Sequence, residues 1–282
     1  HFLNMYDCAD EKYVYYNDTM RKQMLDEQAL MSEMQEALDK HQFEVYLQPK
    51  YNLLTEQPAG AEALVRWNHP QKGFLAPGLF VPLFENNGLI YKLDRYVWEE
   101  TCRFIAYYKK KYGFCVPISV NISRIDVYDP NLPDILLGLI QKYEIEPQEL
   151  HLEITETAYT REPEQLIEIV NKLKGYGFII EMDDFGSGFS SLNMLSSLSV
   201  DILKLDMKFI QDGNFTKEDP GILKYIMEIA EWLKVQVVAE GAETKKQVEM
   251  LKSLNCNYAQ GYYYAKPMPQ AEFEKHVKQC CK

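Results

Sequence analysis

The sequence predicts an α/β fold, a modified (β/α)8 barrel of the TIM type in which one strand near the start is antiparallel. Strand-like and helix-like patterns alternate over roughly 240 residues, which is typical of parallel strands joined by right-handed helical crossovers. The number of strand-like runs, about eight, is the number found in such a barrel. The first two runs, at 43–49 and 60–67, resemble a hairpin, so one departure from parallel order is expected there.

The strand-like runs are short and rich in apolar or β-branched residues, and several alternate apolar with polar side chains. The first run ends at Pro49, which cannot donate a ladder hydrogen bond. Further runs lie at 116–120, 150–156, 178–180, 200–206, 235–240 and 258–262. In each of these the apolar pattern gives way to an acid, an amide or a lysine.

Helical periodicity fills the intervals between these runs. The second predicted helix starts at Asp94, a side chain that commonly caps helix N-termini. The predicted helices cover residues 77–87, 94–112, 132–143, 163–174, 222–233 and 244–254, and an amphipathic stretch closes the chain near Val277.

Ahead of the barrel the pattern differs. Residues 1–19 contain a short aromatic strand pattern at 13–18, and residues 20–40 form a helix with a Met-rich stripe that predicts a linker helix. The barrel is therefore assigned to residues 41–282. The chain begins as though it had been cut from a longer protein.

Composition limits the function classes. A net charge of −12 argues against tracking along a DNA or RNA polymer and against direct contact of this domain with an anionic membrane. The six Cys residues lack the short paired spacing of zinc sites, and no signal peptide precedes them. They indicate reduced thiols and a cytoplasmic location, although the full-length protein could be anchored in a membrane.

The stretch from Glu181 to Leu192 runs from a strand into adjacent carboxylates, Asp183 and Asp184, and then into a loop with two glycines. Adjacent carboxylates favour bound cations, although most such strings only cap a helix or a turn. Glu62 and Arg66 on another run could likewise form an internal salt bridge. From these residues alone, capping by Asp183 and Asp184 and a Glu62–Arg66 salt bridge both stay possible as purely structural interpretations.

The ends of the other runs favour a shared site, because the C-terminal ends of barrel strands meet on one face. Five carboxylates would gather there without a His cluster, which favours Mg²⁺ or Mn²⁺ over zinc. Lys204 could orient or help deprotonate a water, and Arg66 could hold a phosphate. The chemistry that fits is metal-assisted phosphodiester hydrolysis. The residues expected to converge are Glu62, Asn121, Glu153, Asp183, Asp184, Lys204, Glu240 and Gln260.

An ordered series of motifs connects these positions. They are Gln48-Pro, Glu62-Ala-Leu-Val-Arg-Trp, Val120-Asn-Ile-Ser, Leu152-Glu-Ile-Thr-Glu, Asp183-Asp-Phe-Gly-Ser-Gly-Phe-Ser-Ser-Leu, Leu203-Lys-Leu-Asp, Ala239-Glu-Gly-Ala-Glu-Thr and Gln260-Gly-Tyr. Over about residues 40–277 the chain resembles EAL-domain cyclic di-GMP phosphodiesterases. Residues 1–19 resemble the C-terminal tail of a preceding GGDEF-type module.

The resemblance implies hydrolysis of cyclic di-GMP to linear pGpG by water attack assisted by two metal ions, Mg²⁺ or Mn²⁺, with Ca²⁺ expected to inhibit. It also implies a homodimer and upstream GGDEF or sensor modules in the full-length protein. Glu156 would anchor the loop from Asp184 to Ser190. Carried over by position, it makes Glu62, Asn121, Glu153, Asp183, Asp184 and Glu240 metal ligands, Glu62, Lys204 and Glu240 catalytic, and Gln48, Leu64, Arg66 and Gln260 substrate-binding.

Two other functions compete with this interpretation. A degenerate member of the same family would bind cyclic di-GMP without cutting it, but such members usually lack a site acid and this chain keeps them all. An unrelated barrel enzyme could instead act on a sugar phosphate with the acids as general acid and base. The ordered motifs weigh against that second alternative.

Overall fold

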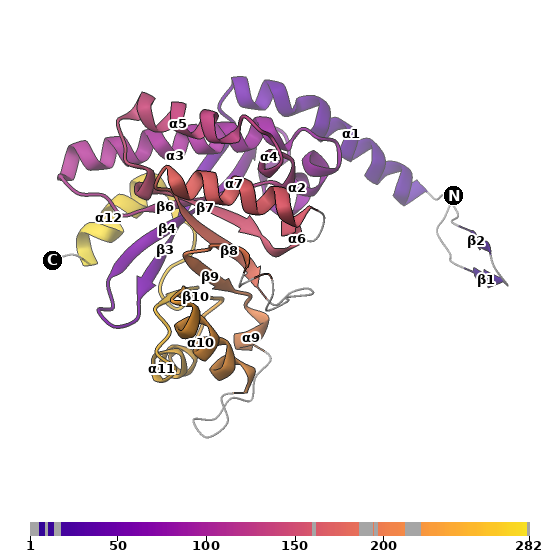
Figure 1. The fold of residues 1–282 in the computed structure, drawn as a ribbon. Coiled ribbons are helices and arrows are strands. Elements are labelled where there is room, and N and C mark those ends of the chain that lie inside the picture. The colour runs from indigo at the N-terminus through magenta and orange to yellow at the C-terminus, as the bar shows by residue number, and fades with distance from the viewer. Residues whose placement is uncertain are drawn as a thin grey trace. The chain divides into compact units, whose positions relative to one another are not determined.

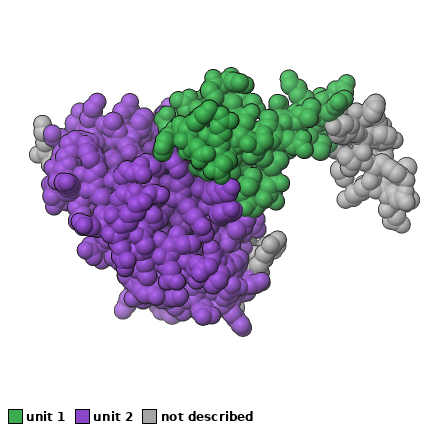
Figure 2. Space-filling view, turned by 90° about the horizontal axis from the view of Figure 1, so that it is seen from above, with its two compact units in different colours: residues 1–44, 66–90 green, residues 45–65, 91–282 purple. Residues whose placement is uncertain are grey.

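A computed structural model describes residues 6–8, 11–13, 18–159, 162–185, 194, 197–211 and 221–280. The chain forms two compact units, one from residues 1–44 and 66–90 and the other from residues 45–65 and 91–282 (Figure 2). Among the described residues, no helix combines the length and apolarity needed to cross a bilayer.

The second unit contains the predicted barrel (Figure 1). Seven neighbouring strands, from β4 to β11 in spatial order, are parallel, and β3 pairs with β11 antiparallel and with β4, which closes the sheet. The prediction of a modified barrel with one antiparallel strand near the start is confirmed. The barrel strands are β3 (Phe43–Asn52), β4 (Pro58–His69), β6 (Ile118–Ile122), β7 (Leu150–Thr155), β8 (Ile179–Phe185), β9 (Ile202–Leu205), β10 (Gln236–Glu240) and β11 (Tyr258–Gln260).

Alternation along these strands separates an apolar from a polar face. Leu152, Ile180 and Leu203 are at most 2% exposed and lie on the side of their strands opposite to the polar residues that follow them. The helices that cover the apolar side are α3 (Ile90–Tyr112), α5 (Leu132–Tyr143), α7 (Pro163–Gly175), α10 (Ile222–Leu233), α11 (Lys245–Ser253) and α12 (Gln270–Cys280). The interior of the barrel is therefore polar, and the apolar core lies between the sheet and the helices.

The first unit contains the predicted linker helix, now α1 (Asp18–Asp39), with α2 (Pro77–Asn86) and β5 (Gly73–Leu75), which pairs with the end of β4. Helix α1 packs against α2, and Met34 on α1 is only 2% exposed. His69 Nε2 lies 2.5 Å from Glu33 Oε2 on α1, while its Nδ1 accepts backbone N–H groups. The C-terminal half of α1 is thus packed within its unit. The assignment of residues 1–19 and 41–282 to separate domains stays a prediction.

Several boundaries differ from the prediction. Strand β3 continues through Pro49 to Asn52, because Tyr51 and Asn52 pair with β11. Helix α3 begins at Ile90, so Asp94 lies inside it and the predicted N-cap role is wrong. The predicted strand at 13–18 falls mostly outside the described residues. Short elements that the pattern did not predict are β1 (Tyr6–Cys8), β2 (Glu11–Tyr13), α4 (Arg124–Val127), a 3-10 turn (Pro147–Glu149), α6 (Glu156–Tyr159), α9 (Lys208–Gln211) and β12 (Met268–Pro269).

Candidate active site

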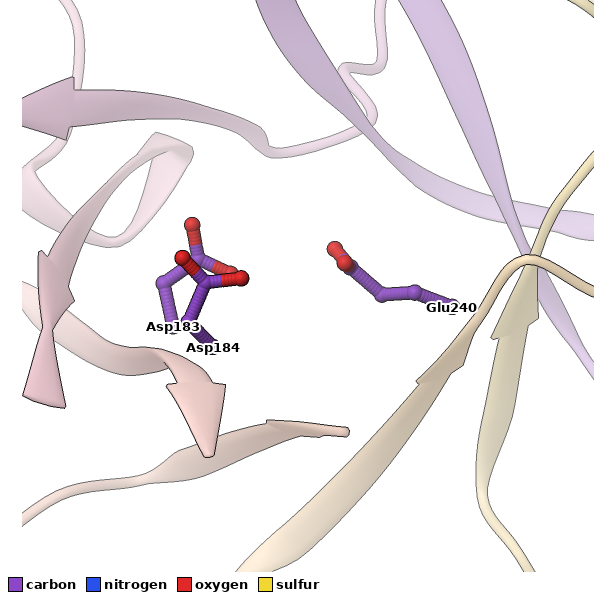
Figure 3. A group of neighbouring side chains, drawn as sticks. All are labelled: Asp183, Asp184 and Glu240. Carbon is purple, nitrogen blue, oxygen red and sulfur yellow. The ribbon is translucent and has the colours of Figure 1, made fainter. Parts of the chain in front are cut away.

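Two consecutive aspartates at the end of β8 face the same side of the sheet. In a regular strand Asp183 and Asp184 would point to opposite faces, but the pairing of β8 with β9 shifts register before Phe185, and Asp184 has a φ of 55°. A bulge of this kind redirects a side chain, and Asp tolerates the left-handed conformation better than most residues. Their carboxylates face that of Glu240 from β10, and one oxygen of each lies within 4.8 Å of the others (Figure 3).

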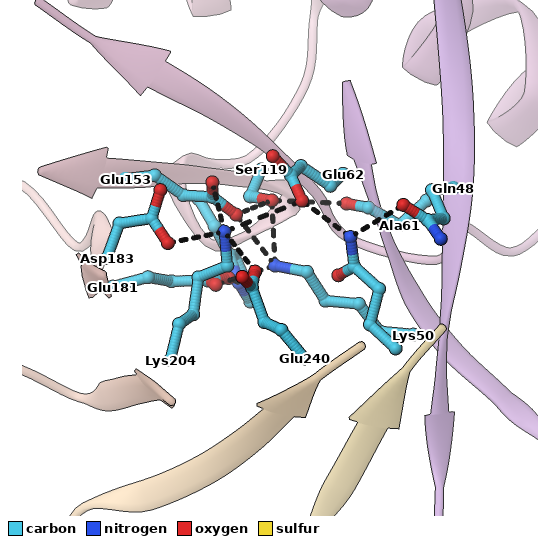
Figure 4. Close-up of polar contacts among 12 residues, drawn as sticks. Gln48, Lys50, Ala61, Glu62, Ser119, Glu153, Glu181, Asp183, Lys204 and Glu240 are labelled. Carbon is cyan, nitrogen blue, oxygen red and sulfur yellow. Dashed lines mark hydrogen bonds and ion pairs between the residues drawn. The ribbon is translucent and has the colours of Figure 1, made fainter. Parts of the chain in front are cut away.

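The ammonium group of Lys204 on β9 lies at the centre of the site (Figure 4). Its Nζ is 2.7 Å from Glu153 Oε2, 2.8 Å from Asp183 Oδ1, 2.9 Å from Glu240 Oε1 and 3.5 Å from Glu62 Oε2. Asp183 Oδ1 is buried and accepts no hydrogen bond among the described residues, so its contact with Lys204 is an ion pair only. One buried lysine therefore joins acids from four other strands.

Two glutamines extend the site toward β3. Gln260 Nε2 donates to Glu62 Oε2 at 2.6 Å and to Gln48 Oε1 at 3.1 Å, and Gln48 Nε2 donates to the Ala265 carbonyl. A cavity of about 280 Å³ opens above them. Its wall includes Gln48, Glu62, Leu64, Asp183, Lys204, Glu240, Gln260 and Tyr262.

The backbone beside this cavity has no room for a side chain at Gly261. A Cβ atom there would lie 2.2 Å from the Ala242 carbonyl oxygen, so only glycine lets the strand end approach the loop after β10 this closely. Gln260 and Glu240, which pair in register, are held side by side in this way.

Burial and neighbouring charges raise the pKa of two acids of the site and lower the pKa of a third. Burial, together with the charge of Glu153, raises the pKa of Glu62 to about 8. Burial and then Asp183 likewise raise the pKa of Glu240. Burial opposes the charge on Glu153 as well, but Lys204 and Lys50 outweigh it and lower its pKa. Lys204 itself has a pKa well above its usual range, because the surrounding carboxylates outweigh its burial.

A second layer of polar residues contacts Glu153 on its side away from Lys204, and the sequence motifs include none of its charged members. Lys50 Nζ on β3 is 2.9 Å from Glu153 Oε1 and 2.6 Å from Glu181 Oε2 on β8. His151 Nδ1 contacts Glu181 Oε1 at 2.7 Å, and Ser119 Oγ bonds Glu153 Oε1. Strand alternation was the available signal, since Lys50 and Glu181 each lie two residues from a predicted site residue.

The other predicted residues are placed less directly. Asn121 is exposed near the end of β6, paired in register with Glu153. Arg66 belongs to the first unit and is half-buried. Glu156 begins α6 and is 2% exposed, whereas the loop residues that it is predicted to anchor, 186–190, lie outside the described residues.

Helix α3 fixes the loop that follows Asn121. Trp98 Nε1 donates to the Asn121 carbonyl at 3.0 Å, and the Asp94 carboxylate accepts from the Ser123 backbone N–H at 3.3 Å. Ser123 caps α4 and donates its hydroxyl to Asp126 at 2.7 Å. Burial and the neighbouring Asp126 carboxylate raise the pKa of Asp94 well above its usual value of 3.8.

This geometry predicts how stability depends on pH. A carboxyl whose pKa is raised in the folded state stabilises the fold fully below its ordinary pKa, and that contribution is lost as pH rises through the raised value. Asp94→Asn keeps an acceptor for Ser123 without the charge, so the melting temperature of the variant minus that of the parent should increase from about pH 4 upward. Thermal melts at several pH values measure this difference. A constant difference would contradict a buried neutral Asp94.

The site residues fit a divalent cation. Asp183, Asp184 and Glu240 offer oxygen ligands only, which Mg²⁺ and Mn²⁺ prefer. The described residues of the site include six carboxyl groups and two ammonium groups, and the crowding of acids that helps raise the pKa of Glu62 and of Glu240 would be relieved by bound cations. The six acids are Glu62, Glu153, Glu181, Asp183, Asp184 and Glu240, and the two cations are Lys50 and Lys204.

The sequence model of the EAL domain family matches residues 31–267 of the chain, well over half of its length. The chain belongs to the EAL-domain family. The resemblance drawn from its motifs is therefore confirmed. The matched segment includes every residue assigned to the site.

Two named relatives of this EAL domain come from Pseudomonas aeruginosa. The bifunctional diguanylate cyclase/cyclic di-GMP phosphodiesterase MucR is 33% identical over 268 residues, and the cyclic di-GMP phosphodiesterase NbdA is 31% identical over 271 residues. These matches cover 94% and 96% of this chain but only 39% and 35% of those proteins. The chain thus spans little more than a third of the length of either relative.

Solved EAL structures share the fold. The structure titled PaMucR phosphodiesterase, c-di-GMP complex, superposes with a TM-score of 0.82 at 34% identity, covering 87% of this chain and 99% of that one. The EAL enzyme Bd1971, in a form with cAMP and cyclic di-GMP bound, gives a TM-score of 0.84 at 27% identity, with 90% and 69% covered.

Proposed function

We propose that this EAL domain hydrolyses cyclic di-GMP to linear pGpG and so lowers the level of a bacterial second messenger. The observation that carries the proposal is the convergence of Glu62, Glu153, Asp183 and Glu240 on Lys204 in a member of this family. A relative of known structure, matched over nearly its whole length, binds the same cyclic dinucleotide.

In the proposed reaction water adds to the phosphorus of one phosphodiester, and the bond from that phosphorus to a ribose 3′ oxygen breaks. The released oxygen takes up a proton, and the phosphate stays on the 5′ side, which gives pGpG. Bound Mg²⁺ or Mn²⁺ ions, two per site, would supply Lewis-acid charge and lower the pKa of water. Their proposed ligands are Glu62, Asn121, Glu153, Asp183, Asp184 and Glu240.

The chain's own groups orient the reactants. Lys204, which contacts four carboxylates, would hold the attacking water by hydrogen bonding, and Glu240 would be a ligand or the base that takes its proton. Gln48, Leu64 and Gln260 line the cavity and would contact the dinucleotide. Arg66 would hold a phosphate through its guanidinium fork.

Glu156 is proposed to anchor the loop that follows Asp184. Glu156 is 2% exposed, and α6, which it begins, packs against β8. A buried carboxylate next to the strand that carries Asp183 and Asp184 is well placed for this role. The loop would then keep Asp184 directed at the second metal position.

Metal dependence and product identity test the function together. Incubation with cyclic di-GMP and Mg²⁺ or Mn²⁺ should yield pGpG, and exhaustive chelation should abolish the yield. Excess Ca²⁺ should lower the rate about tenfold or more, because it tolerates looser geometry and acidifies water less. Chromatographic separation of the products decides the outcome. Hydrolysis that survives chelation would contradict a metal mechanism, and tight binding without cleavage would make the domain a receptor.

Assembly and cellular setting are proposals as well. We expect upstream GGDEF or sensor modules in the full-length protein, since the relatives are much longer than this domain. We also expect a homodimer in solution, as the family resemblance implies. A cytoplasmic location is proposed as well, because the proposed substrate is an intracellular messenger and the Cys pattern indicates reduced thiols.

A further inference from the structure

We propose that Lys50 is a positioning residue for the metal ligand Glu153, and that Glu181 and His151 hold Lys50 in place. This inference rests on the proposed function for the identity of the metal site. It concerns side chains that contact the residues identified by the family motifs but are not among them, and Lys50 and Glu181 are labelled in Figure 4.

Lys50 has a complete and buried set of partners. It is 5% exposed, and its Nζ lies 2.8 Å from Ser119 Oγ, 2.9 Å from Glu153 Oε1 and 2.6 Å from Glu181 Oε2. An ammonium group has three hydrogens to donate, so these three contacts use its whole capacity. The side chain therefore has one arrangement available, fixed by strands β6, β7 and β8.

The two oxygens of Glu153 face different partners. Oε1 accepts from Lys50 and Ser119 below, whereas Oε2 contacts Lys204 at 2.7 Å toward the candidate active site. A carboxylate anchored at one oxygen cannot rotate freely, so the other oxygen keeps a fixed direction. Lys50 thereby determines which atom of Glu153 faces a metal ion.

Glu181 makes this anchor specific to Lys50. Its side chain is fully buried, with Oε2 on Lys50 and Oε1 at 2.7 Å from His151 Nδ1. No motif of the family resemblance includes Glu181 or His151, and neither lines the cavity. Their role is to make burial of Lys50 possible. Among the described residues, Glu153 is the only proposed metal ligand that Lys50 contacts, and Glu181, held by His151, supplies the second charge partner that a buried ammonium needs.

The decisive variant is the double substitution Lys50→Met with Glu181→Gln. Removing Lys50 alone would leave Glu181 as a buried unpaired charge and could unfold the barrel, so the double substitution removes both charges together. Glu181→Gln alone is the matched control, because it keeps the Lys50–Glu153 contact. Binding of Mn²⁺ is measured by electron paramagnetic resonance titration of the free ion, well below each melting temperature.

We expect the double variant to bind Mn²⁺ about 10- to 100-fold more weakly than the control, the range seen when a group that orients a metal ligand is lost. Its kcat should recover in part at saturating Mn²⁺, and its KM for cyclic di-GMP should stay within about twofold of the control. A general loss of structure would not recover with metal.

Ser119→Ala provides an independent second variant, since it removes a bond to the same Oε1 and changes no charge. It should weaken Mn²⁺ binding by about three- to tenfold, as the loss of one ordinary hydrogen bond would. If both the double variant and Ser119→Ala bind Mn²⁺ within twofold of their controls, the inference is wrong. If the double variant does not fold, Ser119→Ala decides alone. Metal binding does not require turnover, so a failure of the phosphodiesterase proposal would be seen separately, in the parent protein.

Discussion

Glu62→Gln should lower kcat for cyclic di-GMP by about 10³-fold while changing the affinity for the dinucleotide by less than about tenfold. The expected loss corresponds to roughly 4 kcal/mol of transition-state stabilisation, at 1.36 kcal/mol per factor of ten. Glutamine can still accept the hydrogen bond from Gln260 Nε2, so the local geometry should survive. What disappears is a carboxyl group that can ionise when a metal binds, and its loss weakens binding of the cations that the reaction requires.

Binding and turnover are measured separately in this experiment. Affinity is determined by calorimetry with Ca²⁺ in place of Mg²⁺, so that the dinucleotide is not consumed, and kcat by pGpG formation with saturating Mg²⁺. The parent protein under the same two conditions is the control. A parallel fall of affinity and kcat would make Glu62 a structural partner of Gln260 and Lys204 and not a metal ligand.

The convergence of the site could be predicted because it follows from topology. Parallel strands of a barrel end on one face, so Glu153, Asp183, Lys204 and Glu240 meet although they are far apart in the sequence. The alternation that placed Glu153 on a polar face was equally reliable, because one strand face packs against helices. Local patterns of period two carry this information in any single sequence.

The deeper layer was missed for a local reason. The sequence pattern ends the first strand at Pro49, because proline has no backbone N–H to donate to a neighbouring strand. In the structure β3 continues to Asn52 and brings Lys50 into the barrel. Only pairing with β11, which is distant in sequence, extends the strand. Glu181 could have been found, because it lies two residues before Asp183 on the same face.

The orientation of Asp184 and the location of Asp94 show a different limit of prediction from sequence. Alternation places Asp184 opposite to Asp183, and only the register shift and the left-handed backbone bring both to one side. Asp94 matched the preferences of an N-cap, but the helix starts earlier and tertiary contact with Ser123 decides its role. Backbone irregularities and long-range partners are not encoded in the residue pattern.

Lys204→Met should destabilise the protein and make its stability depend more strongly on divalent cations. The Lys204 side chain is 1% exposed, and its ammonium contacts the carboxylates of Glu62, Glu153, Asp183 and Glu240. Removing one member of a buried ion cluster leaves uncompensated charge, which typically costs about 3–5 kcal/mol of unfolding free energy. A bound ion raises the free energy of unfolding by RT ln(1 + [L]/Kd). Without the competing ammonium, the acids should bind Mg²⁺ more tightly, so the same Mg²⁺ concentration stabilises the variant more than the parent.

Melting temperatures with and without Mg²⁺ measure both effects, and Lys208→Met is the matched control. Lys208 also pairs with an acid, Asp206 at 3.3 Å, but 68% of its side chain is exposed, so its loss should change little. We expect the increase in melting temperature on adding Mg²⁺ to be larger for Lys204→Met than for the parent and the control, while kcat falls about 10²-fold or more because the attacking water loses its donor. Equal Mg²⁺ shifts in all three proteins would mean that the acids around Lys204 become protonated when it is removed, and that the cluster does not gather cations in its place.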